Sequence, residues 1–130
     1  MAIIIAGLGP GSIDDVTRRV WRALETAQTV ILRTERHPCV PHLPAVQKLI
    51  ACDDLYEKHA AFEAVYDAIV ARVIDHARSG DVVYAVPGDP TIGESTTAKL
   101  RAAAESVGIG VQILPGISFI EPSLALVGVD

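Results

Sequence analysis

The sequence predicts an α/β fold, in which helices flank an open, mainly parallel sheet. Four short apolar runs, at residues 3–6, 29–32, 82–86 and 111–114, have the composition of strands that are covered on both faces. Segments with helical spacing separate these runs, and turns rich in glycine and proline end three of them. Alternating strands and helices are typical of a parallel sheet.

A helix is expected soon after the first strand. The turn Gly7-Leu8-Gly9-Pro10-Gly11 separates the two elements, and Ser12 with Asp15 resembles a capping box. Apolar residues then recur at spacings of four, four and three, which gives one packing face: Val16, Val20, Leu24 and Ala27. The β-branched apolar run 29–32 is the second predicted strand.

The middle of the chain has weaker periodicity. Three prolines within residues 33–44 remove backbone donors and disfavour helix in the residues before them. A short helix is expected over residues 45–49. Asp53 or Asp54 would cap a longer helix that ends at Ser79-Gly80. Its packing side would be lined by Phe62, Tyr66, Ile69, Val73 and Ala77.

Two strands and two helices are expected in the last third of the chain: strands at 82–86 and 111–114, helices at 96–107 and 117–127. Pro87-Gly88-Asp89-Pro90 stops the first of these strands and Pro115-Gly116 stops the second. Gly108 follows the first helix, where a glycine cap is common.

Composition excludes several classes of protein. The 130 residues hold 11 Lys and Arg against 16 Asp and Glu, a net charge of −5, so binding to nucleic acid is not expected. No apolar run approaches the ~20 residues needed to span a bilayer. Cys39 and Cys52 have neither zinc nor CxxC spacing, which favours a reduced, cytoplasmic setting. The apolar segment before Asp130 leads us to expect one subdomain of a longer protein.

Three loops leave carboxyl ends of predicted strands, where open α/β sheets bind ligands: residues 7–11, 87–93 and 115–118. The first partly matches the G-x-G-x-x-G fingerprint, with Ser12 at the third glycine position. Glu35 could hold a ribose and Arg33 a 2′-phosphate, so an NADP-binding Rossmann domain is one interpretation.

Catalytic side chains are not evident in the sequence. The four histidines show no metal-ligand spacing and are expected in surface or capping roles: His37, His42, His59 and His76. No metal site is predicted, and no acid–base or nucleophile motif is present. A reaction at these loops would therefore depend on binding and orientation.

The three loop motifs, taken in series, resemble those of the tetrapyrrole (corrin/porphyrin) methylase family of S-adenosylmethionine-dependent enzymes. The matching segments are Gly-Leu-Gly-Pro-Gly with Val16-Thr17, Tyr84 to Pro90, and Leu114 to Ser118. The resemblance covers roughly residues 2–128, which correspond to the amino-terminal half of such enzymes. It implies two α/β subdomains, a cofactor in the cleft between them, a homodimer and a small-molecule acceptor such as a tetrapyrrole.

A subgroup of that family resembles the chain more closely. This is the methylase-like domain fused to MazG-type nucleoside triphosphate pyrophosphohydrolases, which shares Arg33-Thr34, His37-Pro38 and Asp54 to His59. The pyrophosphohydrolase motifs themselves do not occur in these 130 residues. A non-catalytic module that regulates or dimerises such an enzyme is therefore an alternative.

Carried onto this sequence, the resemblance implies six cofactor-binding residues: Pro10, Gly88, Asp89, Ile92, Ser118 and Phe119. Pro10 would approach the methionine end of S-adenosylmethionine. Ser118 and Phe119 would lie near its adenosine. Asp89 would either orient the cofactor or form an Asx-type turn. Catalytic residues remain unassigned, and the 130-residue chain alone is expected to show little or no catalysis.

Overall fold

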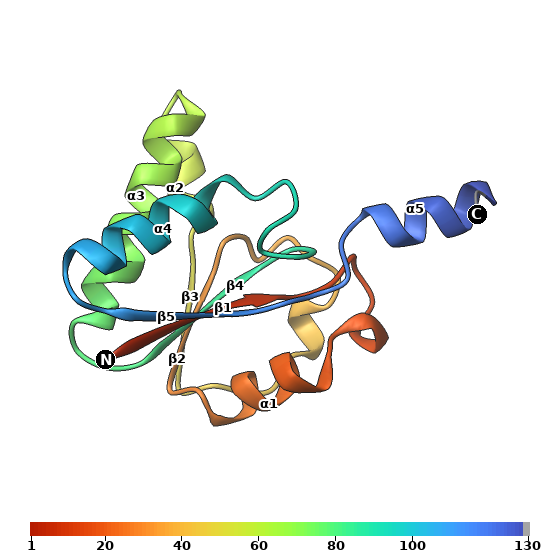
Figure 1. Ribbon diagram of the computed structural model, residues 1–130, viewed down its shortest axis with the longest axis horizontal. Coiled ribbons are helices and arrows are strands. Elements are labelled where there is room, and N and C mark those ends of the chain that lie inside the picture. Colours follow the sequence, from red (N-terminus) through yellow and green to blue (C-terminus); the bar gives the residue numbers. More distant parts are fainter. Residues whose placement is uncertain (129–130) are drawn as a thin grey trace.

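The computed structural model describes residues 1–128 and confirms the α/β fold, built on a five-stranded sheet in the order β3-β2-β4-β1-β5 (Figure 1). All neighbouring strands are parallel. The strands are β1 (Ala2–Gly7), β2 (Thr29–Leu32), β3 (Lys48–Ala51), β4 (Val82–Val86) and β5 (Gly110–Leu114). The helices are α1 (Arg18–Thr26), α2 (Asp53–Lys58), α3 (Phe62–Ala77), α4 (Ser95–Ser106) and α5 (Ile120–Val127).

Strand β1 lies between β4 and β5. Its Ile3 is level with Val82 on one side and with Val111 on the other. This register brings the carboxyl ends of β4, β1 and β5 to the same edge of the sheet. The three glycine-bearing loops therefore leave neighbouring strands.

Helices cover both faces of the sheet, with α1 on one side and α2, α3 and α4 on the other (Figure 1). On the three-helix side, Ile69, Val73 and Leu100 pack in one buried cluster with Ile5 and Tyr84. On the α1 side, Val20 and Leu24 pack with residues of β1, β2 and β4. Burial on both faces explains the continuous apolar runs.

Helix α5 extends away from the sheet (Figure 1) and leaves much of its apolar surface exposed. It begins at Ile120 rather than near 117, because residues 117–119 belong to the loop after β5. The exposed apolar residues of this region are Phe119, Ile120, Leu124, Leu126 and Val127.

The prediction of a helix over residues 45–49 is wrong, because Lys48–Ala51 form β3. Lys48 is level with Thr29 and Ala51 with Leu32, so the segment pairs along the free edge of β2. A helix of five residues would gain few hydrogen bonds for the cost of its nucleation. Pairing with an existing strand satisfies the backbone groups more effectively.

The first helix also begins later than expected. Ser12 caps only a 3₁₀ turn, Ile13–Asp15, by accepting a hydrogen bond from the Asp14 N–H (3.1 Å). Thr17 is the true cap of α1, and its hydroxyl accepts from the Val20 N–H at 3.2 Å. Val16 and Ala27 flank the helix but pack against the same cluster as its buried face.

The long helix expected after Asp53 is two helices, α2 and α3, with a break at residues 59–61. The Arg72 guanidinium of α3 forms a bidentate ion pair with Asp54 of α2 (2.7 and 2.8 Å) and donates to the Ala51 carbonyl. This clamp holds α2 beside α3 and lowers the pKa of Asp54 to about 2, mainly through the hydrogen bonds from Arg72.

Phe62, expected on the packing side of that helix, is 70% exposed, whereas Ile69 is fully buried. Ile69→Ala should therefore lower the free energy of unfolding by about 2–5 kcal/mol, through lost burial and a residual cavity. Phe62→Ala, the matched control, should change it by less than about 1 kcal/mol. Urea unfolding followed by circular dichroism measures both, and equal losses would contradict this assignment of the core.

Candidate functional site

The loops after β1 and β4 are joined by backbone hydrogen bonds. Gly9 N–H donates to the Gly88 carbonyl at 3.1 Å, and Gly88 N–H donates to the Gly9 carbonyl at 2.8 Å. The Leu8 N–H donates to the Val86 carbonyl at 2.8 Å, which continues the pairing of the two strands. Gly9 has φ of +78°, a conformation that side chains rarely permit.

The loop after β5 packs against both of the others through main chain. A Cβ on Gly7 would lie 2.4 Å from the Gly88 carbonyl oxygen and 2.8 Å from the Gly116 nitrogen. A Cβ on Gly116 would lie 2.4 Å from the same Gly88 oxygen. Neither position has space for a side chain, so glycine is required at both.

Asp89 ties the second loop to the third. One carboxylate oxygen accepts from the Thr91 N–H (2.7 Å) and hydroxyl (2.6 Å), and the other accepts from the Gly116 N–H (3.1 Å). Burial alone would raise the pKa of Asp89, but the bonds from Thr91 and Gly116 outweigh it and lower that pKa. The contact with Thr91 has the form of the expected Asx turn.

The remaining predicted cofactor residues surround this junction. Ser118 is buried, donates to the Glu121 carboxylate and accepts from the Ile120 N–H, so it holds the start of α5. Pro10 is half-buried, whereas Ile92 and Phe119 are 40% and 61% exposed. The Phe119 ring lies beside Gly93 of the second loop. The structure therefore brings the first, second and third loops together. The exposed side chains of Ile92 and Phe119 form an apolar rim beside them.

The junction also contains backbone donors that no acceptor in the described part of the chain engages. Within residues 1–128, the backbone N–H groups of Asp89, Ile117 and Ser118 donate to no protein acceptor. Backbone donors at strand ends, beside exposed apolar side chains, fit a ligand with a polar edge and an apolar body.

A buried histidine, for which the sequence predicts a surface or capping role, contacts the first loop. His37 is 7% exposed and its Nε2 lies 3.0 Å from the Gly9 carbonyl oxygen. Its position before Pro38, in a segment without periodicity, gave no signal of this contact. Nothing in the spacing of the four histidines distinguished it from the others.

The Arg33 side chain, considered above for a 2′-phosphate, is engaged by the protein. Its Nη1 lies 3.0 Å from the Glu94 carboxylate, which also accepts from the Thr96 N–H and hydroxyl. The Thr96 hydroxyl in turn bonds the Tyr84 hydroxyl at 2.8 Å. In addition, β1 neighbours β4 rather than β2, unlike the usual dinucleotide-binding order. Both observations weigh against an NADP site.

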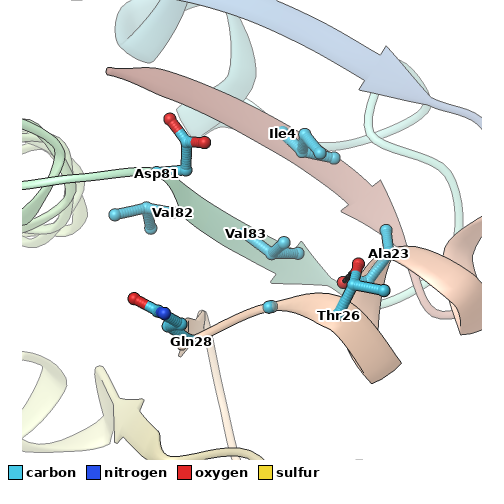
Figure 2. Close-up of a pocket in the computed structure, with 8 residues that line it drawn as sticks. Ile4, Ala23, Thr26, Gln28, Asp81, Val82 and Val83 are labelled. Carbon is cyan, nitrogen blue, oxygen red and sulfur yellow. Dashed lines mark hydrogen bonds between the residues drawn. The ribbon is translucent and has the colours of Figure 1, made fainter.

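A separate pocket lies at the opposite edge of the sheet, near the amino ends of β1 and β4 (Figure 2). Ile4, Val83 and Ala23 line it, and Gln28 and Asp81 come from the chain leading into β2 and β4. Asp81 accepts from the Ala2 N–H at 2.9 Å, so its carboxylate fastens the start of β1. This pocket lies away from the glycine loops.

The described residues contain neither a metal-binding cluster nor a membrane-spanning helix. Across residues 1–128, no three His, Cys, Asp or Glu side chains are grouped so that they could hold a metal ion. No helix of that part of the chain has the length and apolar character needed to cross a membrane.

In open α/β sheets, ligands bind outside the carboxyl ends of the strands, and the three glycine loops of this chain meet at that edge. Residues 2–130 match the family Tetrapyrrole (Corrin/Porphyrin) Methylases. The chain belongs to this family, as its three loop motifs predicted.

Individual relatives are longer than the chain. The uncharacterized protein YabN of Bacillus subtilis (strain 168) is 38% identical over 98% of the chain, which covers 26% of that protein. Precorrin-4 C(11)-methyltransferase of Rhodococcus erythropolis is 27% identical over 98% of the chain, which covers 49% of it. The chain thus spans about a quarter of one relative and half of the other.

A solved structure shares the fold. It is the uroporphyrin-III C-methyltransferase of Thermus thermophilus complexed with S-adenosylhomocysteine, with a TM-score of 0.69 and 23% identity. The match covers 98% of this chain and 48% of that one.

Gly7→Ala should lower the free energy of unfolding by about 3 kcal/mol or more, because the new methyl group would overlap the Gly88 carbonyl. Gly80→Ala is the matched control, since a Cβ there meets no heavy atom within 4 Å. Thermal and urea unfolding of both variants test this. A Gly7 variant as stable as the Gly80 variant would refute the close backbone contact.

Asp89→Asn should lower the free energy of unfolding by about 1–3 kcal/mol at pH 7, because an amide cannot accept all the hydrogen bonds that reach the carboxylate. The pKa of Asp89 is lowered in the folded protein, so its stabilisation is present above the ordinary value of 3.8 and lost as the pH falls. Stability measured from about pH 5 to pH 3 should fall more steeply in the wild type than in Asp89→Asn. Asp75→Asn, at an exposed site, should retain the wild-type slope.

Proposed function

We propose that the chain carries part of the S-adenosylmethionine site of a methyltransferase, at the junction of the three glycine loops. The observation that carries this proposal is the main-chain contact of Gly7, Gly88 and Gly116, with unused backbone donors beside it. Family membership and the fold shared with an enzyme complexed with S-adenosylhomocysteine support it. A carboxyl-terminal subdomain, as in longer relatives, would complete the cleft.

The six predicted residues would act in two ways. Asp89 and Ser118 would offer main-chain N–H groups, because their side chains already bond within the loops. Gly88, whose N–H and carbonyl both bond Gly9, would shape the same part of the site. Pro10, Ile92 and Phe119 would pack against the apolar parts of the cofactor, since all three have exposed surface. Asp89 would therefore orient the cofactor through the loops that it ties.

When bound, S-adenosylmethionine supplies a sulfonium-activated methyl group for in-line displacement by a carbon or oxygen atom of the acceptor. The loops of this chain would hold that methyl group in one orientation, and the rim of Ile92 and Phe119 would exclude water from it. The Asp89 and Glu121 carboxylates, which lie at the junction, bond to protein partners. We assign no catalytic acid or base to the chain, and we expect little turnover from it alone.

The wider setting follows from the same resemblance. We propose a small-molecule acceptor of the tetrapyrrole class, a cytoplasmic location, a homodimer and no resident metal. Fusion to a pyrophosphohydrolase domain belongs to the alternative, in which the chain is a regulatory or dimerisation module. That alternative predicts an intact fold that binds no S-adenosylhomocysteine.

Calorimetric titration of S-adenosylhomocysteine into the longest soluble protein that contains this chain tests the proposal. We expect binding, with none for NADPH as the control ligand. Binding of NADPH alone would favour a Rossmann domain, and binding of neither would favour the regulatory module.

A matched pair of variants places the site. Ile92 and Val107 are apolar and similarly exposed, at 40% and 42%, but only Ile92 lies in a glycine loop. Ile92→Glu should lower the affinity for S-adenosylhomocysteine at least tenfold, because it places a solvated charge in the apolar rim. Val107→Glu should bind this ligand with the affinity of the wild type. Equal affinities for the two variants would show that the second loop is not part of the binding site.

A further inference from the structure

We propose that His37 is a positioning residue for the cofactor site, because its Nε2 proton holds the Gly9 carbonyl in the first glycine loop. The inference rests on the proposed function, since it assigns the purpose of that loop to ligand binding. The contact itself is a property of the fold and can be tested separately.

The Gly9 carbonyl accepts two hydrogen bonds from opposite parts of the chain. One comes from the Gly88 N–H at 2.8 Å, within the bridge between the first and second loops. The other comes from His37 Nε2 at 3.0 Å. This carbonyl belongs to the residue before Pro10, so its orientation fixes where Pro10 enters the site.

The partners of His37 determine its tautomer. The Gly9 carbonyl can only accept, so Nε2 carries the proton. The Cys39 N–H can only donate, and it lies 3.3 Å from Nδ1, so Nδ1 is the acceptor. The Cys39 thiol lies 3.1 Å from the same nitrogen. Burial raises the pKa of that thiol, which therefore retains its proton. The ring is therefore held by hydrogen bonds at both nitrogens.

His37 also connects two parts of the sheet edge that the strands do not connect directly. It follows β2, which neighbours β4 and not β1, yet its side chain reaches the loop after β1. The next residue, Pro38, lies beside Gly11 of the same loop. The first loop is thus fastened from β2 by His37, as the third loop is fastened from the second by Asp89.

Loss of the Nε2 donor would leave the Gly9 carbonyl with only the bond from Gly88. His37 follows β2 and makes none of the hydrogen bonds that pair the strands, so the sheet would remain. The first loop would then sample more conformations, and a ligand would have to order it on binding. The cost should appear in ligand affinity more than in the folding of the sheet.

Two substitutions test the roles of the two ring nitrogens separately. The glutamine amide nitrogen of His37→Gln can reach the place of Nε2 and donate to Gly9. The asparagine oxygen of His37→Asn can accept from Cys39 but cannot reach Gly9. His42→Asn, at an exposed position in the same segment, is the control. We expect at least fivefold weaker S-adenosylhomocysteine binding for His37→Asn, with His37→Gln within about twofold of the wild type. Equal affinities for the two His37 variants would overturn the proposal.

Amide hydrogen exchange tests the anchor independently of any ligand. In His37→Asn, the Gly88 N–H that bonds Gly9 should exchange at least tenfold faster, while the Ile5 N–H in β1 should exchange as in the wild type. Unchanged exchange at Gly88 would overturn the proposal even if the fold is intact. If the wild type binds no S-adenosylhomocysteine, the proposed function fails, and the exchange measurement alone then decides whether His37 anchors the loop.

Discussion

The Gly88 carbonyl oxygen occupies the space into which a side chain on either Gly7 or Gly116 would extend. Three strand ends therefore meet through main chain alone, and their loops cannot shift far without overlap. Asp89 and His37 add hydrogen bonds that fasten the third and first loops to this contact. The shape of the candidate site is thus fixed by backbone packing and two buried side chains. Residues on its rim, such as Ile92 and Phe119, are not part of that framework.

Most of the fold could be predicted from local sequence, because strands buried on both faces are continuously apolar. The exceptions are segments whose structure depends on a distant partner. Lys48–Ala51 becomes a strand only because the edge of β2 is available for pairing. The break between α2 and α3 is accompanied by an ion pair between Asp54 and Arg72, which are 18 residues apart. Helical spacing alone gives no indication of either contact.

Part of the candidate site could also be predicted from local sequence. Glycine beside proline after a strand marks a loop, and parallel pairing brings such loops to one edge, so the position of Asp89 could be anticipated. Its double role, with Thr91 and Gly116 on different oxygens, required the structure. His37 could not be found from sequence, because a contact across 28 residues decides between an exposed and a buried histidine.

The central place of β1 in the sheet has a consequence for synthesis of the protein. Ile3 pairs with Val82 and Val111, so β1 is made before either of its neighbours. At about 5–20 residues per second, those partners leave the ribosome roughly 4–20 seconds later. During that interval an apolar, β-branched strand has no native partner, a state that favours association between nascent chains. The strand that supports the candidate site can therefore reach its native pairing only after β4 or β5 has been synthesised.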